Sequence, residues 1–251
     1  MAAGIAPWTP VLSFRDSGMR VSALTAFGIA MGFLEAAVVV YLRWLYYPEG
    51  FSFPLKPVVF ERLYVEYLRE IATLIMLFSF SLLAGRNFQE RLSFFLFSFG
   101  VWDISYYGWL KLLLDWPSSM LTWDILFLIP VIWTGPVLAP VICSLTMIAI
   151  GGCIMYFQHK GYAVKIGVTE AVFFLSGAVI IFATFVWDFS AMILTGNYIF
   201  RVLTLAADPE FRLLVSNYVP DTYGWRLFAL GEFLMLISLL MLCRKARGTR
   251  K

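Results

Sequence analysis

The sequence predicts an all-α polytopic membrane protein, a bundle of about six transmembrane helices with helical connections on the outer side. Of the 251 residues, 61% are hydrophobic and only 14% are charged, and the mean hydropathy is +0.82. An ordinary soluble domain carries about 25% charged residues. Long apolar segments also recur along the chain, with short basic stretches between them. A soluble core cannot absorb this much apolar surface, so the solvent of this protein is partly lipid.

Six segments reach the length of about 20 predominantly apolar residues that a spanning helix needs. These segments are 21–43, 66–85, 92–114, 131–157, 167–187 and 226–243. The first has polar residues on both sides and no small-residue cleavage site, so we expect a retained anchor and not a removed signal peptide. The chain then divides into a loose tail (1–20), a six-span domain (21–243) and a basic tail (244–251).

Lysine and arginine predict the orientation of these spans. An even number of spans places both termini on one side, and eleven of the 19 basic residues then fall on that side. The loops 86–91 and 158–166 are short and basic, and the chain ends in "RKARGTRK". Because cytoplasmic flanks carry an excess of Lys and Arg, we expect cytoplasmic termini. The chain lacks N-x-S/T acceptors and a sorting tail, which favours an inner bacterial membrane.

Two connections do not read as simple spans. Residues 116–130 ("WPSSMLTWDILFLIP") are apolar but too short to cross, so we expect a short interfacial or re-entrant helix before the fourth span. Residues 188–225 form a long outer connection in which apolar and charged residues are mixed. That mixture is typical of interfacial helices, and we expect a helix pair that caps the bundle.

The sequence singles out no metal, cofactor or catalytic residue. It has one histidine (His159), and its three cysteines form no C-x-x-C pair, which argues against zinc, haem and iron–sulfur sites. H-E-x-x-H, G-x-S-x-G and phosphate-binding glycine motifs are absent. A carboxylate site for Mg²⁺ or Ca²⁺ at Asp115, Asp124 and Asp188 is chemically allowed, but their spacing does not favour it. We therefore expect no cofactor.

Carboxylates nevertheless recur inside the apolar segments. Glu35 lies past the middle of the first span, Asp103 near the middle of the third, and Glu232 about a third of the way into the sixth. A charge at the centre of a membrane helix costs about 2.5–3.5 kcal/mol on insertion scales. Several such acids cannot all face lipid, so they must point inward, pair, take up a proton or line water.

Basic and polar side chains accompany these acids at helical spacing. Asp103, Tyr107 and Lys111 follow one another at intervals of four residues, which places them on one helix face. The small-residue face of Gly28 and Gly32 lets another helix approach closely beside Glu35. The predicted substrate- or ion-binding residues are Glu35, Arg69, Glu70, Asp103, Tyr107, Lys111, Asp124, Asp188 and Glu232.

Three functions remain open at this level. In the first, these residues line an outward cavity that binds or transports a small solute or ion, in a proton-linked manner if Asp103 or Glu35 carries a proton. In the second, they form a salt-bridged network in a structural or accessory subunit of a membrane complex. In the third and least favoured, a carboxylate acts as general base on lipid head groups at the outer leaflet.

The expected partners follow from composition. The lipid bilayer is the first, membrane proteins or a second copy of the chain remain open, and nothing favours nucleic acid. A water-accessible cavity reaching Asp103 would favour binding or transport, whereas a dry and fully paired cluster would favour the structural role. A groove open sideways near Asp124 and Asp188 would favour the enzyme. The fourth span carries Pro130, Pro136 and Pro140 at its start, and we expect them to begin this helix and not to break it.

Overall fold

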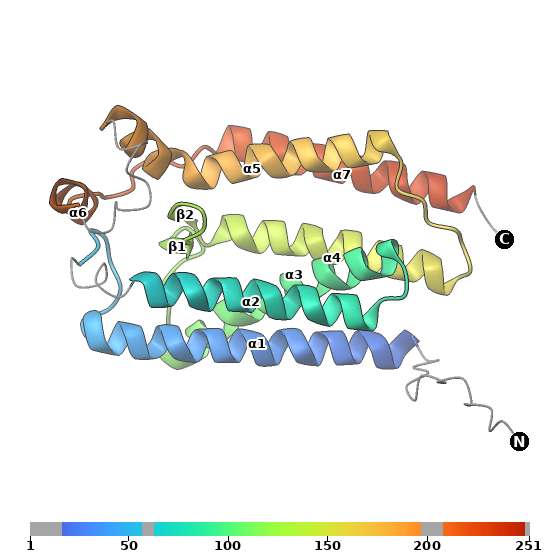
Figure 1. Ribbon diagram of the computed structural model, residues 1–251, viewed down its shortest axis with the longest axis horizontal. Coiled ribbons are helices and arrows are strands. Elements are labelled where there is room, and N and C mark those ends of the chain that lie inside the picture. The colour runs from blue at the N-terminus through green and yellow to red at the C-terminus, as the bar shows by residue number, and fades with distance from the viewer. Residues whose placement is uncertain (1–16, 57–62, 197–207, 249–251) are drawn as a thin grey trace, which may run out of the picture.

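The computed structural model describes residues 17–56, 63–196 and 208–248. In that part of the chain there are six long helices, of which five run roughly along one axis and the third in sequence crosses them obliquely (Figure 1). A short helix and a two-stranded hairpin lie at one end. The long helices are α1 (Ser17–Tyr46), α2 (Leu63–Ala84), α3 (Phe88–Leu114), α4 (Leu138–His159), α5 (Val168–Thr195) and α7 (Trp225–Arg247). The short elements are β1 (Trp123–Phe127), β2 (Trp133–Pro136) and α6 (Pro209–Ser216).

Five of these helices, α1, α2, α4, α5 and α7, are long and apolar enough to cross a membrane. The remaining long helix, α3, has 27 residues and is therefore about 40 Å long, but it is less apolar and carries Asp103 near its middle. It packs against both α1 and α4 and is thereby screened from lipid on two sides. The protein is a polytopic helical membrane protein, which confirms the predicted fold class.

The molecule has two chemically different ends. The start of α1, the α2–α3 and α4–α5 connections and the end of α7 lie together at what we call the basic end, on the right of Figure 1. Arg86, Lys160, Lys165 and Arg244 belong to this end. The hairpin and α6 lie at the opposite end, which we call the hairpin end. The clustering of basic residues that the sequence indicates is therefore a clustering in space.

Small residues allow α1 and α3 to approach closely. A Cβ atom added to Gly32 would lie 2.9 Å from the Trp102 carbonyl oxygen and from the Tyr106 amide nitrogen. One added to Gly28 would lie 2.8 Å from the side chain of Val101. The predicted role of this small-residue face is thus confirmed, and the contact brings Glu35 on α1 to the side of the bundle that α3 covers.

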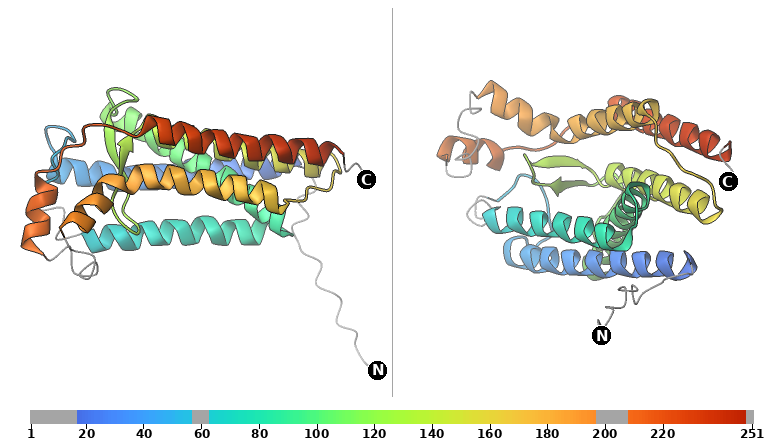
Figure 2. Two further views of the ribbon diagram at one scale, coloured as in Figure 1. Left: turned by 90° about the horizontal axis from the view of Figure 1, so that it is seen from above. Right: turned by 45° about the vertical axis from the view of Figure 1, so that its right-hand side comes forward.

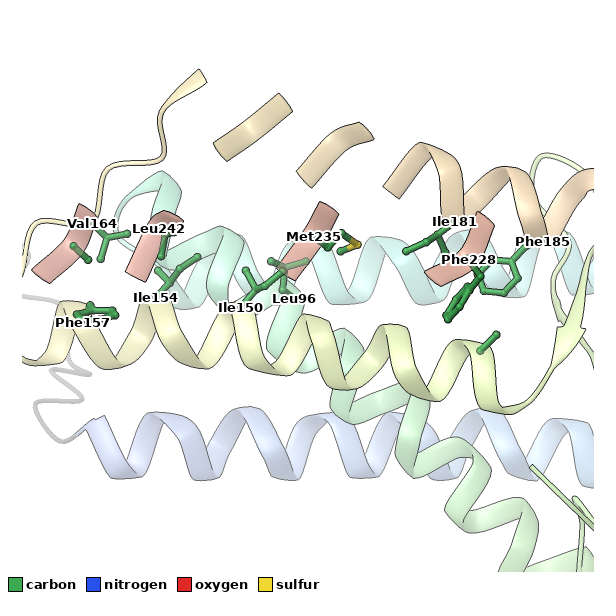
Figure 3. Packing of buried hydrophobic residues seen from close by; sticks show 12 residues of the cluster. Leu96, Ile150, Ile154, Phe157, Val164, Ile181, Phe185, Phe228, Met235 and Leu242 are labelled. Atoms are coloured by element: carbon green, nitrogen blue, oxygen red, sulfur yellow. The ribbon is translucent and has the colours of Figure 1, made fainter. Parts of the chain in front are cut away.

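The largest apolar core lies between α4 and the pair of α5 and α7, which run side by side (Figures 2 and 3). Figure 3 shows α4 side chains meeting those of α7 along most of the helix length. The labelled members include Ile150, Ile154, Phe157, Ile181, Phe185, Phe228, Met235 and Leu242. This half of the bundle is packed mainly with apolar side chains, although it also buries Glu170 and Glu232. Arg43, Glu70 and Asp124 are buried in the other half, where α1, α2 and the hairpin meet.

Residues 116–130 correct one prediction, because they contain a β-strand and no helix. β1 pairs antiparallel with β2, with Asp124 opposite Gly135 and Ile125 opposite Thr134. The β-branched and aromatic residues of both strands suit a pleated ribbon, and prolines at 117, 130 and 136 disfavour a continuous helix. Span four accordingly begins at Leu138 and not at 131, and Pro140 sits in the first turn of α4, where proline is tolerated.

The long outer connection matches its prediction in part. Helix α5 continues through Asp188 to Thr195, so this acid lies within the helix and not beyond it. Helix α6 begins at an Asp208 cap, whose carboxylate accepts hydrogen bonds from the amides of Glu210 and Phe211 at 3.0 and 3.3 Å. The first half of the predicted helix pair (197–207) lies outside the described residues, as do 1–16 and 249–251. Helix α1 begins inside the predicted tail, and α7 covers half of the basic one.

Candidate functional site

A cavity of about 380 Å³ lies toward the hairpin end, between α1, α2, α3 and the β1–β2 hairpin. Most of its lining is apolar, including Val39, Leu42 and Leu128. Its charged lining residues are Glu35, Arg43, Glu66, Arg69, Glu70, Asp103 and Asp124. Toward the basic end the gap between α1 and α2 is closed, because Phe27 and Phe80 stack there with their ring centroids 4.0 Å apart.

Arg69 holds one group of charges together on the α2 side of the cavity. Its Nε donates to Glu66 Oε2 at 2.7 Å, and its Nη1 forms an ion pair with Glu35 of α1. The hydroxyl of Thr73 donates to the second oxygen of Glu35 at 3.1 Å. Glu66, Arg69 and Thr73 face Glu35 together because they recur at three- and four-residue spacing. One arginine thus partners two carboxylates and links α1 to α2.

Arg43 and Asp124 form a second group, joining α1 to the hairpin. Arg43 Nη2 lies 3.3 Å from Asp124 Oδ1, and the Tyr107 hydroxyl donates to Asp124 Oδ2 at 3.4 Å. The guanidinium also lies over the rings of Trp116 and Phe51, at 3.7 and 4.8 Å from their centroids. Burial raises the pKa of Asp124 to about 6, although Arg43 opposes this shift.

Two carboxylates of the cavity form no salt bridge with any described basic residue: Glu70 and Asp103. Glu70 Oε2 accepts the amide hydrogen of Leu128 at 2.9 Å, and Asp103 Oδ2 accepts the hydroxyl hydrogen of Ser144 at 2.7 Å. Each is therefore positioned by one neutral donor, from the hairpin and from α4. A charge held only by neutral donors in an apolar wall is ready to take up a proton or a cation.

Six of the nine predicted site residues line this cavity: Glu35, Arg69, Glu70, Asp103, Tyr107 and Asp124. The other three lie elsewhere. Lys111 is exposed and forms an ion pair with Asp115 at 2.7 Å. Asp188 accepts a hydrogen bond from the Tyr218 hydroxyl at 2.5 Å. Glu232 accepts a hydrogen bond from the Thr146 hydroxyl at 2.7 Å. Glu232 lies apart because its helix, α7, packs against α4 and α5 and not against α1 or α2.

The predicted set omits residues that the cavity uses, above all Arg43 and Glu66. The spacing of both residues in the sequence could have identified them. Arg43 follows Glu35 by eight residues, about two helical turns, so it shares that face of α1, and Glu66 precedes Glu70 by one turn. The role of Trp116 beneath Arg43 had no such signal, because it depends on how the segment after α3 turns back over α1.

The structure does not bring the three acids considered for a metal together. Asp115 lies at the surface and pairs with Lys111. Asp124 pairs with Arg43, and Asp188 accepts a hydrogen bond from Tyr218. Among the residues that the structure describes, no group of three or more His, Cys, Asp or Glu side chains could hold a metal ion. The groups that the cavity wall itself offers are carboxylates, guanidinium groups and aromatic rings.

Comparison with known proteins adds no family to this picture. No family model, no curated protein and no solved structure matches the chain. The function must therefore be inferred from the cavity, its charges and its place in the bundle.

Proposed function

We propose that this protein binds a small solute or ion in the cavity at its hairpin end, as a membrane binding or transport protein. The observation that carries the proposal is the convergence of charged side chains from α1, α2, α3 and the hairpin on one open volume of about 380 Å³. Ligand pockets of proteins fall in the range of about 300–1,000 Å³, are mostly apolar and hold a few placed polar groups. The cavity has each of these properties.

The unpaired acids favour this function over a purely structural network. A network that only fixes helix register would be expected to pair its charges fully, because each unpaired buried charge is costly. Here Arg43 and Arg69 are engaged with three carboxylates, and neither Glu70 nor Asp103 has a salt-bridge partner among the described residues. These two acids are the groups that we propose contact the solute or carry a proton.

A lipid-head-group enzyme is less well supported. That function would need a carboxylate in a groove near Asp124 and Asp188, but Asp188 lies outside the cavity and is bound by Tyr218. Asp124 lies inside it but is occupied by Arg43 and Tyr107. A subunit role remains compatible with the exposed apolar helices, which any membrane-spanning bundle presents.

The orientation belongs to the same proposal. Because the basic end carries the arginines and lysines of the short connections, it is placed in the cytoplasm by the positive-inside rule. Both termini then lie inside, and the cavity opens toward the outer face of the membrane. The cell (inner) membrane of a bacterium is the proposed location.

Thiol accessibility tests the proposal. In a variant with Cys143, Cys153 and Cys243 replaced by alanine, Val39→Cys or Ile125→Cys places one thiol in the cavity wall. We expect a charged, membrane-impermeant maleimide to label both from outside intact cells.

The matched control is Ile150→Cys, which places a thiol in the buried core around α4 and should stay unlabelled. Cavity thiols that react no faster than the thiol of this control variant would contradict an open, solvent-filled site.

A further inference from the structure

The cavity wall carries more negative than positive charge. Five of the described lining residues are acids, and two are arginines. Arg69 is shared between Glu35 and Glu66, and Arg43 is used by Asp124. Arg69 also attracts Glu70, but from beyond salt-bridge distance. An incoming group that completes this charge balance must be positive.

Aromatic rings surround the same space. Trp102, Tyr106 and Tyr107 line it from α3, and Tyr47 and Phe51 line it from the segment that follows α1. Ring faces attract organic cations, and quaternary ammonium groups in particular are recognised by aromatic cages. The apolar residues between these rings, such as Leu42, favour a ligand with an apolar body over a hydrated metal ion.

Two donors in the wall have no partner in the structure. Nη1 of Arg43 and Nε1 of Trp102 are buried and form no hydrogen bond with any described residue. The two residues are only 7% and 5% exposed, and both line the cavity. A buried donor without an acceptor is costly, so an acceptor oxygen on the ligand would stabilise the occupied cavity. Nε1 of Trp102 takes no part in the ion pairs, so it favours an oxygen-bearing ligand independently of the acidic cluster.

We infer that the ligand of this cavity is an organic ammonium compound that has an apolar body and at least one acceptor oxygen. Its ammonium group contacts Glu70 and Asp103, its body lies against the α3 rings, and its oxygen accepts from Arg43 or Trp102. The inference rests on the proposed function and narrows it to one ligand class. It also assigns the two unpaired acids a common role, which an anionic ligand would not do.

Benzoylcholine is a suitable probe because it combines a permanent ammonium charge, an ester oxygen and a phenyl ring. Its neutral isostere, 3,3-dimethylbutyl benzoate, replaces the nitrogen by carbon and keeps the shape. A third compound, 4-phenylbutyl trimethylammonium, keeps the charge and lacks the ester. Binding of each would be measured on the full chain in lipid nanodiscs, with empty nanodiscs correcting for partition into lipid.

We expect benzoylcholine to bind saturably and the neutral ester to bind about tenfold more weakly or worse. Glu70→Gln and Asp103→Asn should each weaken benzoylcholine binding by about tenfold and leave ester binding unchanged. Both replacements keep an oxygen that accepts from Leu128 or Ser144, so each hydrogen bond can persist. The compound without the ester should bind more weakly than benzoylcholine. Glu232→Gln, a buried acid outside the cavity, is the matched control and should change nothing.

The inference is overturned if the ester binds as tightly as benzoylcholine, if Glu232→Gln weakens binding as much as Glu70→Gln, or if no probe binds. These failures can be separated from failure of the proposed function. If the ester binds and Val39→Trp, which fills the cavity, abolishes its binding, the cavity still holds solutes and only the ligand class is wrong. If no probe binds and the cavity thiols also resist the maleimide, both proposals fail.

Discussion

At the scale of single residues, the molecule divides its buried charges into paired and unpaired groups. The side chains of Glu35, Glu66 and Arg69 are between 12% and 21% exposed, and they hold one another in place. Glu70 and Asp103 are instead held by one amide and one hydroxyl. The first group joins the walls of the cavity, and the second is the group that we propose contacts the ligand. This division is a property of individual side chains and follows from which neighbour each one meets.

Arg69→Met should destabilise the protein strongly, by about 3 kcal/mol or more, because it leaves two mostly buried carboxylates without their cation. Lys111→Met is the matched control, since it also removes one cation of an ion pair, but at the surface, and stability should stay close to that of the wild type. Chemical denaturation in detergent micelles measures both. Equal stability of the two variants would mean that Arg69 does not partner buried acids.

Asp124 should make stability depend on pH. Because burial raises the pKa of Asp124 to about 6, the folded protein holds this proton more tightly than the unfolded chain does. The resulting stabilisation is complete below about pH 4 and is lost as the pH rises through about 6. We expect the free energy of unfolding to fall by up to about 3 kcal/mol over this interval through this group.

The Asp124→Asn variant isolates that contribution, because it removes the titrating group and leaves the other carboxylates. Its stability should fall less steeply than that of the wild type between about pH 4 and about pH 6.5. Thermal unfolding followed by circular dichroism at several pH values gives the comparison. Parallel curves for the two proteins would show that the Asp124 pKa is not raised.

At the scale of elements, the long helices were predictable and the hairpin was not. Twenty apolar residues in a row have few alternatives in a membrane, so all six predicted spans overlap the observed long helices. Residues 116–137 are too short and too apolar to show a clear period, and apolar periodicity cannot separate a short strand from a buried helix there. The pairing of Asp124 with Gly135 could therefore not be predicted from the sequence.

Side-chain contacts between different helices could also not be predicted from the sequence. The sequence predicts where each acid lies along its helix, but which acids share a cavity depends on how each helix is rotated about its axis. Glu232 illustrates this: its depth resembles that of Glu35, yet it faces Thr146 of α4. Spacing within one helix, such as that of Glu66 and Arg69, was informative because helix geometry sets the relative position of the two side chains whichever way the helix is rotated.

The α1–α3 contact offers a test at this scale. Gly32→Ala should destabilise the protein by about 1–3 kcal/mol, because the new methyl group meets the Trp102 carbonyl and the Tyr106 amide, which are backbone and cannot turn away. Gly108→Ala on α3 adds the same methyl group where no atom lies within 4 Å, and it should be neutral or stabilising. Thermal unfolding in detergent compares the two. A harmless Gly32→Ala would contradict the close approach of the two helices.

At the scale of the whole molecule, one half of the bundle has a mainly apolar core and the other holds the cavity. Helices α4, α5 and α7 enclose an apolar core, as Figure 3 shows, and helices α1, α2 and α3 meet the hairpin around charges. The stacked Phe27 and Phe80 close the gap between α1 and α2 toward the basic end, and the hairpin forms one wall of the cavity. The chain thus builds an apolar core beside a cavity whose mostly apolar wall carries a few charged groups, which suits the proposed binding function.

A double-mutant cycle on Arg43 and Asp124 tests the existence of this cavity most directly, because the pair joins α1 to a hairpin 81 residues away. The variants are Arg43→Met, Asp124→Asn and the combination, with unfolding free energies measured at one pH near neutrality. We predict that Arg43→Met is costly, because it leaves the Asp124 carboxylate buried without its cation. The double variant should be less destabilised than the sum of the two single effects, with a coupling of about 1–3 kcal/mol. Strictly additive effects would show that the two side chains do not meet, and the hairpin would then not form a wall of the cavity beside α1.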